Sequence, residues 1–193
     1  MDSVVMRQRQ PVTLRKPNIA LTGFSTTGKS TVCRRLAAAL GWYRVDTDDL
    51  ITVTTGKPIE VIFRDDGEPT FRALESAVLA ASLAGRDNVV ATGGGAVISP
   101  ANRALMRERA WVVCLSAQPE TVLARLAEAA RIEPRPLLAG ADPLARITAL
   151  LEQRRAFYAE ADLIVETDAL TPADVTDIIL EWVLTQETDR RLA

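Results

Sequence analysis

The sequence predicts a three-layer α/β/α fold built on a five-stranded parallel sheet. Two observations lead to this fold class. Short apolar runs alternate along the chain with segments of helical periodicity, and a glycine loop joins the first run to the first helical segment. Parallel strands need crossover connections, so this alternation places helices on both faces of the sheet. The five predicted strands are residues 18–22, 42–46, 88–92, 110–115 and 163–167.

The predicted helices are bounded by caps and breakers. The first runs from the glycine loop to Leu40, with Gly41 as its C-cap. Residues 131–140 contain two prolines and a glycine, which predicts a loop between two helices. The remaining helices are predicted at residues 70–84, 100–108, 118–130, 142–160 and 171–186.

Residues 49–85 carry more helix than a simple strand-to-strand connection needs. The helical pattern there is interrupted at residues 56–58 and again at residues 65–69. We therefore predict a helical insertion at about residues 48–85, near the binding face of the sheet.

Length and polarity predict the domain organisation. A chain of 193 residues suits one domain, which we place at residues 17–187. Residues 1–16 are polar and without a clear period, so we expect a flexible N-terminal extension, and residues 188–193 form a tail.

Composition excludes several classes of function. The chain has 23 Lys and Arg residues against 25 Asp and Glu, a net charge of −2, so charge gives no reason to expect nucleic acid or a membrane surface as a partner. A long uncharged apolar run is lacking, so no transmembrane span is predicted. Two cysteines suit a reducing compartment, and we expect a cytoplasmic protein that is a monomer.

The sequence contains no histidine. Ser/His/Asp and Cys/His catalysis are therefore excluded, as is nearly every type of zinc site. Any general base must be a carboxylate or a lysine.

The glycine loop, residues 23–30, reads Gly-Phe-Ser-Thr-Thr-Gly-Lys-Ser and fits G-x-x-x-x-G-K-S/T at every fixed position. Because it lies between a strand and a helix, its backbone N–H groups would converge on an anion, as in a P-loop. We expect Lys29 to neutralise the β- and γ-phosphates of a nucleotide and the Ser30 hydroxyl to bind Mg²⁺.

Asp46 and Asp48 lie where the second strand ends, beside the predicted phosphate loop. The two side chains share a face if the strand continues, and they diverge if it breaks at Thr47. Phosphoryl transfer needs one carboxylate for Mg²⁺ and one to accept the proton of the acceptor hydroxyl, and this pair could divide those roles. An acidic surface turn is the alternative.

Further candidates are Gly93, Gly94 and Gly95, which end the third strand and would let a ligand approach the backbone. Arg72, Arg135 and Arg154 could make two-point contacts with carboxylates or phosphates, although most arginines in a chain are solvated. Glu75, three residues after Arg72, could orient it.

Taken in order, these residues resemble the shikimate kinases, a branch of the nucleoside-monophosphate-kinase-like P-loop proteins. The resemblance runs from Ile19 to about Trp182. It includes the phosphate loop and the Asp-Thr-Asp, Asp-Gly-Glu, Phe-Arg-x-x-Glu, Gly-Gly-Gly, Arg-Pro-Leu-Leu and Arg-x-x-x-Tyr motifs at residues 46–48, 66–68, 71–75, 93–95, 135–138 and 154–158.

The resemblance implies ATP-dependent phosphorylation of the 3-hydroxyl of shikimate, a step of chorismate and aromatic amino-acid biosynthesis. It implies that Asp48 is the base, that Lys29 and Arg135 assist the transfer, and that Arg135 lies on a mobile lid at about residues 131–142. Mg²⁺ would be bound by Ser30 and Asp46. The implied ATP-binding residues are Ser25, Thr26, Thr27, Gly28, Lys29, Ser30, Thr31, Arg135, Thr167 and Pro172. The implied shikimate-binding residues are Asp48, Phe63, Phe71, Arg72, Gly93, Gly94, Gly95 and Arg154. Arg125 is a weak candidate for an adenine contact.

Two positions depart from the family. Thr26 stands where the family usually has a glycine, so the loop must accommodate a Cβ atom there. Thr52 stands where an acidic residue is common, which could remove a supporting contact.

Two other functions remain open from the sequence. One is a kinase for another small hydroxy acid, such as gluconate; the other is a non-catalytic nucleotide-binding regulator derived from the family. Arg72, Arg154 and the three glycines argue against the first, and the presence of the base and of both substrate arginines argues against the second.

Overall fold

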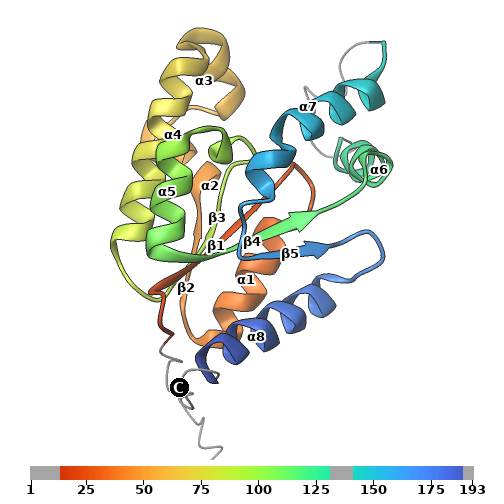
Figure 1. Ribbon diagram of the computed structural model, residues 1–193. Coiled ribbons are helices and arrows are strands. Elements are labelled where there is room, and N and C mark those ends of the chain that lie inside the picture. The colour runs from red at the N-terminus through yellow and green to blue at the C-terminus, as the bar shows by residue number, and fades with distance from the viewer. Residues whose placement is uncertain (1–13, 131–140, 189–193) are drawn as a thin grey trace, which may run out of the picture.

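The computed structural model describes residues 14–130 and 141–188. Within these ranges a five-stranded parallel sheet has the strand order β2-β3-β1-β4-β5 (Figure 1). The predicted fold class is confirmed. The strands are β1 (Asn18–Gly23), β2 (Tyr43–Asp46), β3 (Asn88–Ala91), β4 (Ala110–Ser116) and β5 (Leu163–Glu166).

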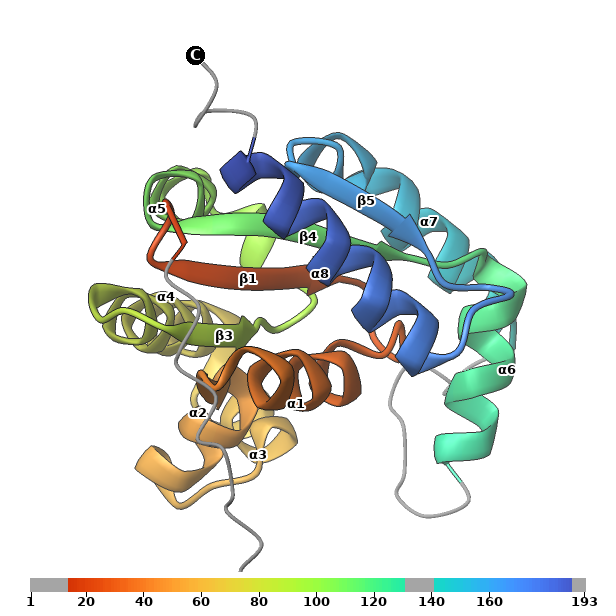
Figure 2. The same cartoon turned by 90° about the horizontal axis from the view of Figure 1, so that it is seen from below.

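Helices cover both faces of the sheet (Figure 2). One face packs against α1 (Lys29–Leu40) and α8 (Pro172–Thr188). The other packs against α4 (Gly67–Ala84), α5 (Pro100–Arg109) and α7 (Pro143–Tyr158).

The strand period of two divides the core between these layers. Ile19 and Leu21 of β1 pack in the α1 and α8 layer, whereas Ala20 packs in the layer of α4, α5 and α7. A third cluster joins α6 (Pro119–Ala129) to α7 and to the buried ring of Phe24. It lies beside the phosphate loop.

The predicted insertion consists of α2 (Thr47–Thr55), α3 (Ile59–Asp65) and α4. Ile51, Ile62 and Phe71 form a small core of their own between these helices. The predicted break at residues 65–69 is wrong in extent, because α4 begins at Gly67. Pro69 fits its first turn, where the missing N–H has no intrahelical partner.

The strand and helix bounds otherwise differ from the predicted ones by at most two residues. One element was not predicted, the 3₁₀ turn η1 (Ala96–Ile98) that follows the three glycines. Among the described helices, none is long and apolar enough to cross a membrane.

Residues 14–16, assigned to the N-terminal extension from sequence, contact the domain. Leu14 is buried in the same core cluster as Trp111, and the Lys16 ammonium lies 3.1 Å from the Asp162 carboxylate. Asp162 also accepts a hydrogen bond from the Val112 amide. These contacts tie the start of the described chain to β4.

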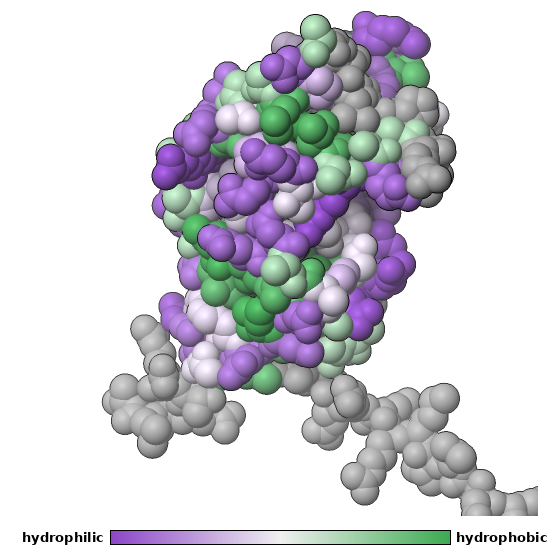
Figure 3. All heavy atoms as spheres, turned by 90° about the vertical axis from the view of Figure 1, so that its right-hand side faces the viewer, coloured by the Kyte–Doolittle hydropathy of each residue, from purple (hydrophilic) through white to green (hydrophobic). Residues whose placement is uncertain are grey.

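Figure 3 shows the face formed by α6, α7, β5 and α8, on which hydrophobic side chains lie in separate patches among hydrophilic ones. Ile164, Ile178 and Leu184 are among the exposed apolar residues of β5 and α8. The monomeric state stays a prediction.

Candidate active site

The phosphate loop connects β1 to α1, as predicted. Gly23 has a φ of 132°, and a Cβ atom there would overlap the Leu115 carbonyl oxygen, so the loop requires glycine at that position. Gly28, the N-cap of α1, has a φ of 97°. The Thr27 hydroxyl donates to the Phe24 carbonyl at 2.9 Å, which braces the loop from inside.

A pocket of about 470 Å³ opens over this loop and over the start of α1. Its lining residues are Ser25, Thr26, Gly28, Lys29, Ser30, Thr31, Asp46, Asp48, Thr92, Gly94 and Arg125. We call it the nucleotide pocket. Thr27, predicted as an ATP-binding residue, has its side chain turned inward and is absent from this lining.

Lys29 reaches into the nucleotide pocket, and its ammonium group donates to the Phe24 carbonyl at 2.6 Å. Burial lowers its pKa to about 8, although the carboxylates of Asp48 and Asp46 favour the charged form. A bound phosphate would supply the counter-charge that burial makes necessary.

Asp46 ends β2 and caps α2. Its Oδ1 accepts from the Asp48 amide at 3.2 Å, and its Oδ2 accepts from the Ser30 hydroxyl at 2.6 Å. Because α2 begins at Thr47, the strand breaks there, so the alternative in which Asp46 and Asp48 share one strand face is excluded. The carboxyl of Asp46 joins the start of α1 to the start of α2.

Asp48 lies in the first turn of α2 and lines two pockets at once. Its Oδ1 is buried and has no hydrogen-bond partner among the described residues. Burial raises the pKa of this carboxyl to about 6, while the nearby Lys29 acts in the opposite direction. The carboxyl can therefore take up a proton near neutral pH. The hydroxyl of Thr52, a position that departs from the family, donates to the Asp48 carbonyl at 3.0 Å.

The second pocket has a volume of about 740 Å³ and lies between α3, α4, the three glycines and α7. We call it the acceptor pocket. It shares Ser25, Asp48 and Gly94 with the nucleotide pocket. The other lining residues are Phe24, Ile59, Glu60, Phe63, Arg64, Glu68, Phe71, Arg72, Glu75, Gly93, Gly95, Arg146, Leu150 and Arg154.

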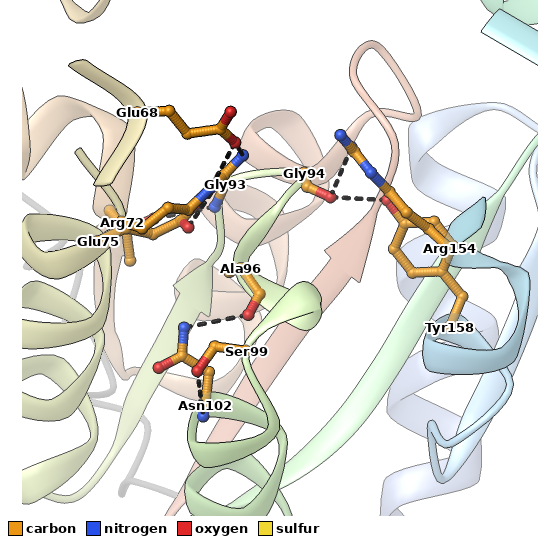
Figure 4. Close-up of polar contacts among 11 residues, drawn as sticks. Glu68, Arg72, Glu75, Gly93, Gly94, Ala96, Ser99, Asn102, Arg154 and Tyr158 are labelled. Atoms are coloured by element: carbon orange, nitrogen blue, oxygen red, sulfur yellow. Dashed lines mark hydrogen bonds and ion pairs between the residues drawn. The ribbon is translucent and has the colours of Figure 1, made fainter. Parts of the chain in front are cut away.

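Arg72 enters the acceptor pocket from α4 and is held by carboxylates (Figure 4). It donates to Glu75 at 2.8 Å and to Glu68 at 3.0 Å. Its guanidinium carbon lies 5.3 Å from the centre of the Phe71 ring, whose own centre is 4.5 Å from that of Phe63. The orientation of Arg72 by Glu75, suggested by their spacing in the sequence, is present in the structure. Burial raises the pKa of Glu75, and its pairing with Arg72 opposes that shift.

Residues 93–95 pass between α4 and α7 (Figure 4). A Cβ atom on Gly93 would overlap the Glu75 carboxylate, and one on Gly95 would overlap the Arg72 guanidinium. Because residues 93 and 95 are glycines, the Glu75 carboxylate and the Arg72 guanidinium can approach this backbone more closely than a side chain at either position would allow. The Gly94 carbonyl accepts from Arg154 at 3.2 Å and from the Tyr158 hydroxyl at 2.7 Å.

Arg125 of α6 was only a weak candidate from the sequence. It donates to the Thr167 hydroxyl at 3.0 Å and to the Thr167 carbonyl at 2.6 Å, and it lines the nucleotide pocket. Thr167 and Pro172 follow β5 but do not themselves line that pocket. Arg135 and nearly all of the predicted lid lie outside the described residues.

Thr26 has a φ of 61°, a left-handed conformation that is unfavourable for a β-branched residue. This explains the expectation of glycine at that position. The Thr26 hydroxyl donates to the Ser25 carbonyl at 2.7 Å, and the pocket over the loop stays open.

The structure thus places most of the predicted residues of both halves along two adjoining pockets, whereas Thr27, Thr167 and Pro172 line neither and Arg135 lies outside the described residues. It also adds Thr92 and Tyr158, which contact segments far away in the sequence. A parallel α/β sheet with a lysine-containing phosphate loop and an adjoining acceptor pocket defines a P-loop kinase of small molecules.

Comparisons with known proteins give the family. The sequence model described as shikimate kinase matches residues 25–184. The shikimate kinase of Symbiobacterium thermophilum is 43% identical over 165 residues, covering 85% of this chain and 94% of that protein. The shikimate kinase of Saccharopolyspora erythraea is 44% identical over 172 residues, which cover 86% of this chain and 94% of that protein. The chain belongs to the shikimate kinase family, and the prediction of an ATP-dependent small-molecule kinase is confirmed.

Comparison with solved structures agrees with this family assignment. The shikimate kinase of Acinetobacter baumannii in complex with shikimate has a TM-score of 0.81 and 35% identity, covering 89% of this chain and 95% of that one. A gluconokinase from Sinorhizobium meliloti has a TM-score of 0.58 and 19% identity, covering 92% and 98%. At that identity the gluconokinase shows a shared fold alone.

Proposed function

We propose that this protein transfers the γ-phosphoryl group of ATP to the 3-hydroxyl group of shikimate, giving shikimate 3-phosphate. The observation that carries the proposal is the position of Asp48. Its carboxyl lies between a pocket over the phosphate loop and a second pocket that contains Arg72 and Arg154. A group in that position can face the acceptor hydroxyl and the phosphoryl group together.

Magnesium fits the residues at the start of α1. The hydroxyl of Ser30 and the carboxylate of Asp46 provide hard oxygen ligands only 2.6 Å apart at the edge of the nucleotide pocket. Mg²⁺ is commonly bound by one or two protein oxygens together with substrate phosphates, so this set suffices. When bound, the ion would neutralise charge on the phosphates.

Asp48 accepts the proton of the attacking hydroxyl. Its raised pKa, about 6, keeps it largely ionised at neutral pH and makes it a stronger base than an ordinary aspartate. Lys29 binds the transferring phosphate from the loop side, where its charge is least solvated.

Arg72 and Arg154 hold the carboxylate of shikimate. They come from α4 and α7 on opposite sides of residues 93–95, and their fork of N–H donors suits a carboxylate. Phe63 and Phe71 supply an apolar wall of the acceptor pocket. The backbone of residues 93–95 contacts the carbon ring of shikimate.

The proposal is tested by measuring ADP release with MgATP and a panel of acceptors that includes shikimate and gluconate. We expect turnover with shikimate and at most background rates with gluconate. Turnover with gluconate alone would establish the other hydroxy-acid kinase. Binding of ATP by folded protein without turnover of shikimate would favour the non-catalytic regulator.

A further inference from the structure

We infer that Tyr158 is a positioning residue for the acceptor: its hydroxyl fixes the Gly94 carbonyl, and through it the backbone that receives shikimate. This inference rests on the proposed function. It assigns a role to a side chain that does not itself line the acceptor pocket.

The contact is short and enclosed. The Tyr158 hydroxyl donates to the Gly94 carbonyl at 2.7 Å, and the tyrosine is 9% exposed. Arg154, one helical turn earlier on α7, donates to the same carbonyl at 3.2 Å (Figure 4). One backbone oxygen therefore links the carboxylate-binding arginine to the glycine segment.

Gly94 is the member of that segment that lines both pockets. A Cβ atom built on it would lie 3.4 Å from the Gly23 carbonyl oxygen and 3.5 Å from the Ser25 amide nitrogen, so Gly94 also touches the phosphate loop. The Gly94 carbonyl belongs to the peptide that leads to Gly95, and Gly95 lines the acceptor pocket but not the nucleotide pocket, so a rotation of that peptide would chiefly shift the backbone on the acceptor side.

The fixed Gly94 carbonyl also determines where the N–H group of Gly95 points, because the two belong to one peptide. Among the described residues, the N–H groups of Gly94 and Gly95 have no hydrogen-bond acceptor, whereas the Gly93 N–H donates to the Thr47 hydroxyl at 3.0 Å. Since a peptide is planar, holding the Gly94 carbonyl toward α7 turns the Gly95 N–H the opposite way. That N–H is thereby kept available to a ligand.

Packing alone does not account for a tyrosine here. The ring of Tyr158 belongs to the apolar cluster with Val97 and Cys114, and a phenylalanine ring would fill the same space. Burial raises the pKa of Tyr158 to about 12, so the phenol remains a hydrogen-bond donor throughout the working pH range.

The test is Tyr158→Phe, with Tyr43→Phe as the matched control because Tyr43 is 73% exposed on β2. The KM for shikimate and the KM for MgATP are measured separately, together with kcat and the melting temperature. Losing one of two hydrogen bonds to this partly buried carbonyl should raise the KM for shikimate roughly 3- to 10-fold. The KM for MgATP should change less than about twofold, since the phosphate loop keeps its own contacts. Tyr43→Phe should match the parent protein.

A lower melting temperature with both KM values unchanged would show a purely structural tyrosine and overturn the inference. An equal rise in both KM values would overturn it as well. If the parent protein turned over shikimate normally and Tyr158→Phe did too, the inference would fail while the proposed function stood. A folded parent protein without shikimate turnover would overturn the proposed function, and the inference with it.

Discussion

The phosphate loop and the acceptor pocket lie side by side, yet they draw on different lengths of chain. The nucleotide side comes mostly from one continuous segment, residues 23–31, where backbone groups and one lysine converge at the start of α1. The acceptor side is assembled from α2, α3, α4, the three glycines and α7, spread over more than a hundred residues.

This difference affects how each half is held. The loop is braced by short-range bonds, such as the one from Thr27 to Phe24. The acceptor side depends on long-range contacts, of which the bonds from Arg154 and Tyr158 to Gly94 span about sixty residues. Asp48 is the charged side chain that lines both pockets, so substitutions of Asp48, of the nucleotide side and of the acceptor side should have distinct effects.

The largest expected effect is that of Asp48→Asn. Loss of the base should lower kcat roughly 10²- to 10⁴-fold, while the dissociation constants for shikimate and nucleotide change little. Asp49→Asn is the matched control, because Asp49 is exposed and pairs with Arg44 away from the pockets. Steady-state kinetics and titrations of each ligand check this, and a kcat within a few-fold of the parent would exclude Asp48 as the base.

The same carboxyl predicts the pH dependence of activity. Asp48, with a pKa near 6, must be ionised to act, so kcat/KM for shikimate should fall about tenfold per unit below pH 6. In the ligand-free protein Lys29 has a pKa of about 8, so kcat/KM for MgATP should decline above pH 8 as its charge is lost. Together the two groups predict a maximum between about pH 6 and 8.

Stability should respond to pH with a defined sign. The folded-state pKa of Asp48 is raised above its ordinary value of 3.8, so between pH 3.8 and about 6 the folded state binds more protons than the unfolded state. The contribution of Asp48 to the free energy of unfolding therefore falls as pH rises through that window. Asp48→Asn should remove this dependence, which urea unfolding at several pH values measures. If Asp48→Asn kept both the fall in activity below pH 6 and the parent's dependence of stability on pH, Asp48 would not be the group that titrates near pH 6.

The smallest expected effect is on the loop itself. Thr26→Gly removes the strain of a threonine in the left-handed conformation, which should stabilise the folded state by roughly 1–2 kcal/mol. The glycine also raises the chain entropy of the unfolded state, which opposes this gain by about 0.5–1 kcal/mol. The free energy of unfolding should therefore rise by about 0–1.5 kcal/mol. Asp87→Gly, at a φ of 61° far along the chain, is the control, and it should gain less because aspartate tolerates this conformation. A marked loss of stability in Thr26→Gly would show that its hydroxyl contacts outweigh the strain.

Local patterns in the sequence were sufficient to predict the five strands, the phosphate loop and the fold class. They could not decide whether Asp46 and Asp48 share a face, because that depends on where β2 gives way to α2. Arg125 was only a weak candidate from the sequence and Tyr158 had no predicted role, since they act on backbone groups 42 and 64 residues away, respectively. Pro69 misled the prediction because a proline in a first helical turn looks like a break in the helix.

The central claim is that two separately built pockets meet at Asp48. The most direct test is to measure the dissociation constants of shikimate and of a non-hydrolysable MgATP analogue for Arg72→Ala and Lys29→Ala, with the exposed Arg107→Ala as control. We predict that Arg72→Ala weakens shikimate binding by about 2–5 kcal/mol, or about 30- to 4,000-fold, and leaves the nucleotide nearly unaffected. Lys29→Ala should weaken the nucleotide and spare shikimate. If each substitution weakened both ligands equally, the division of the site into two halves would be contradicted.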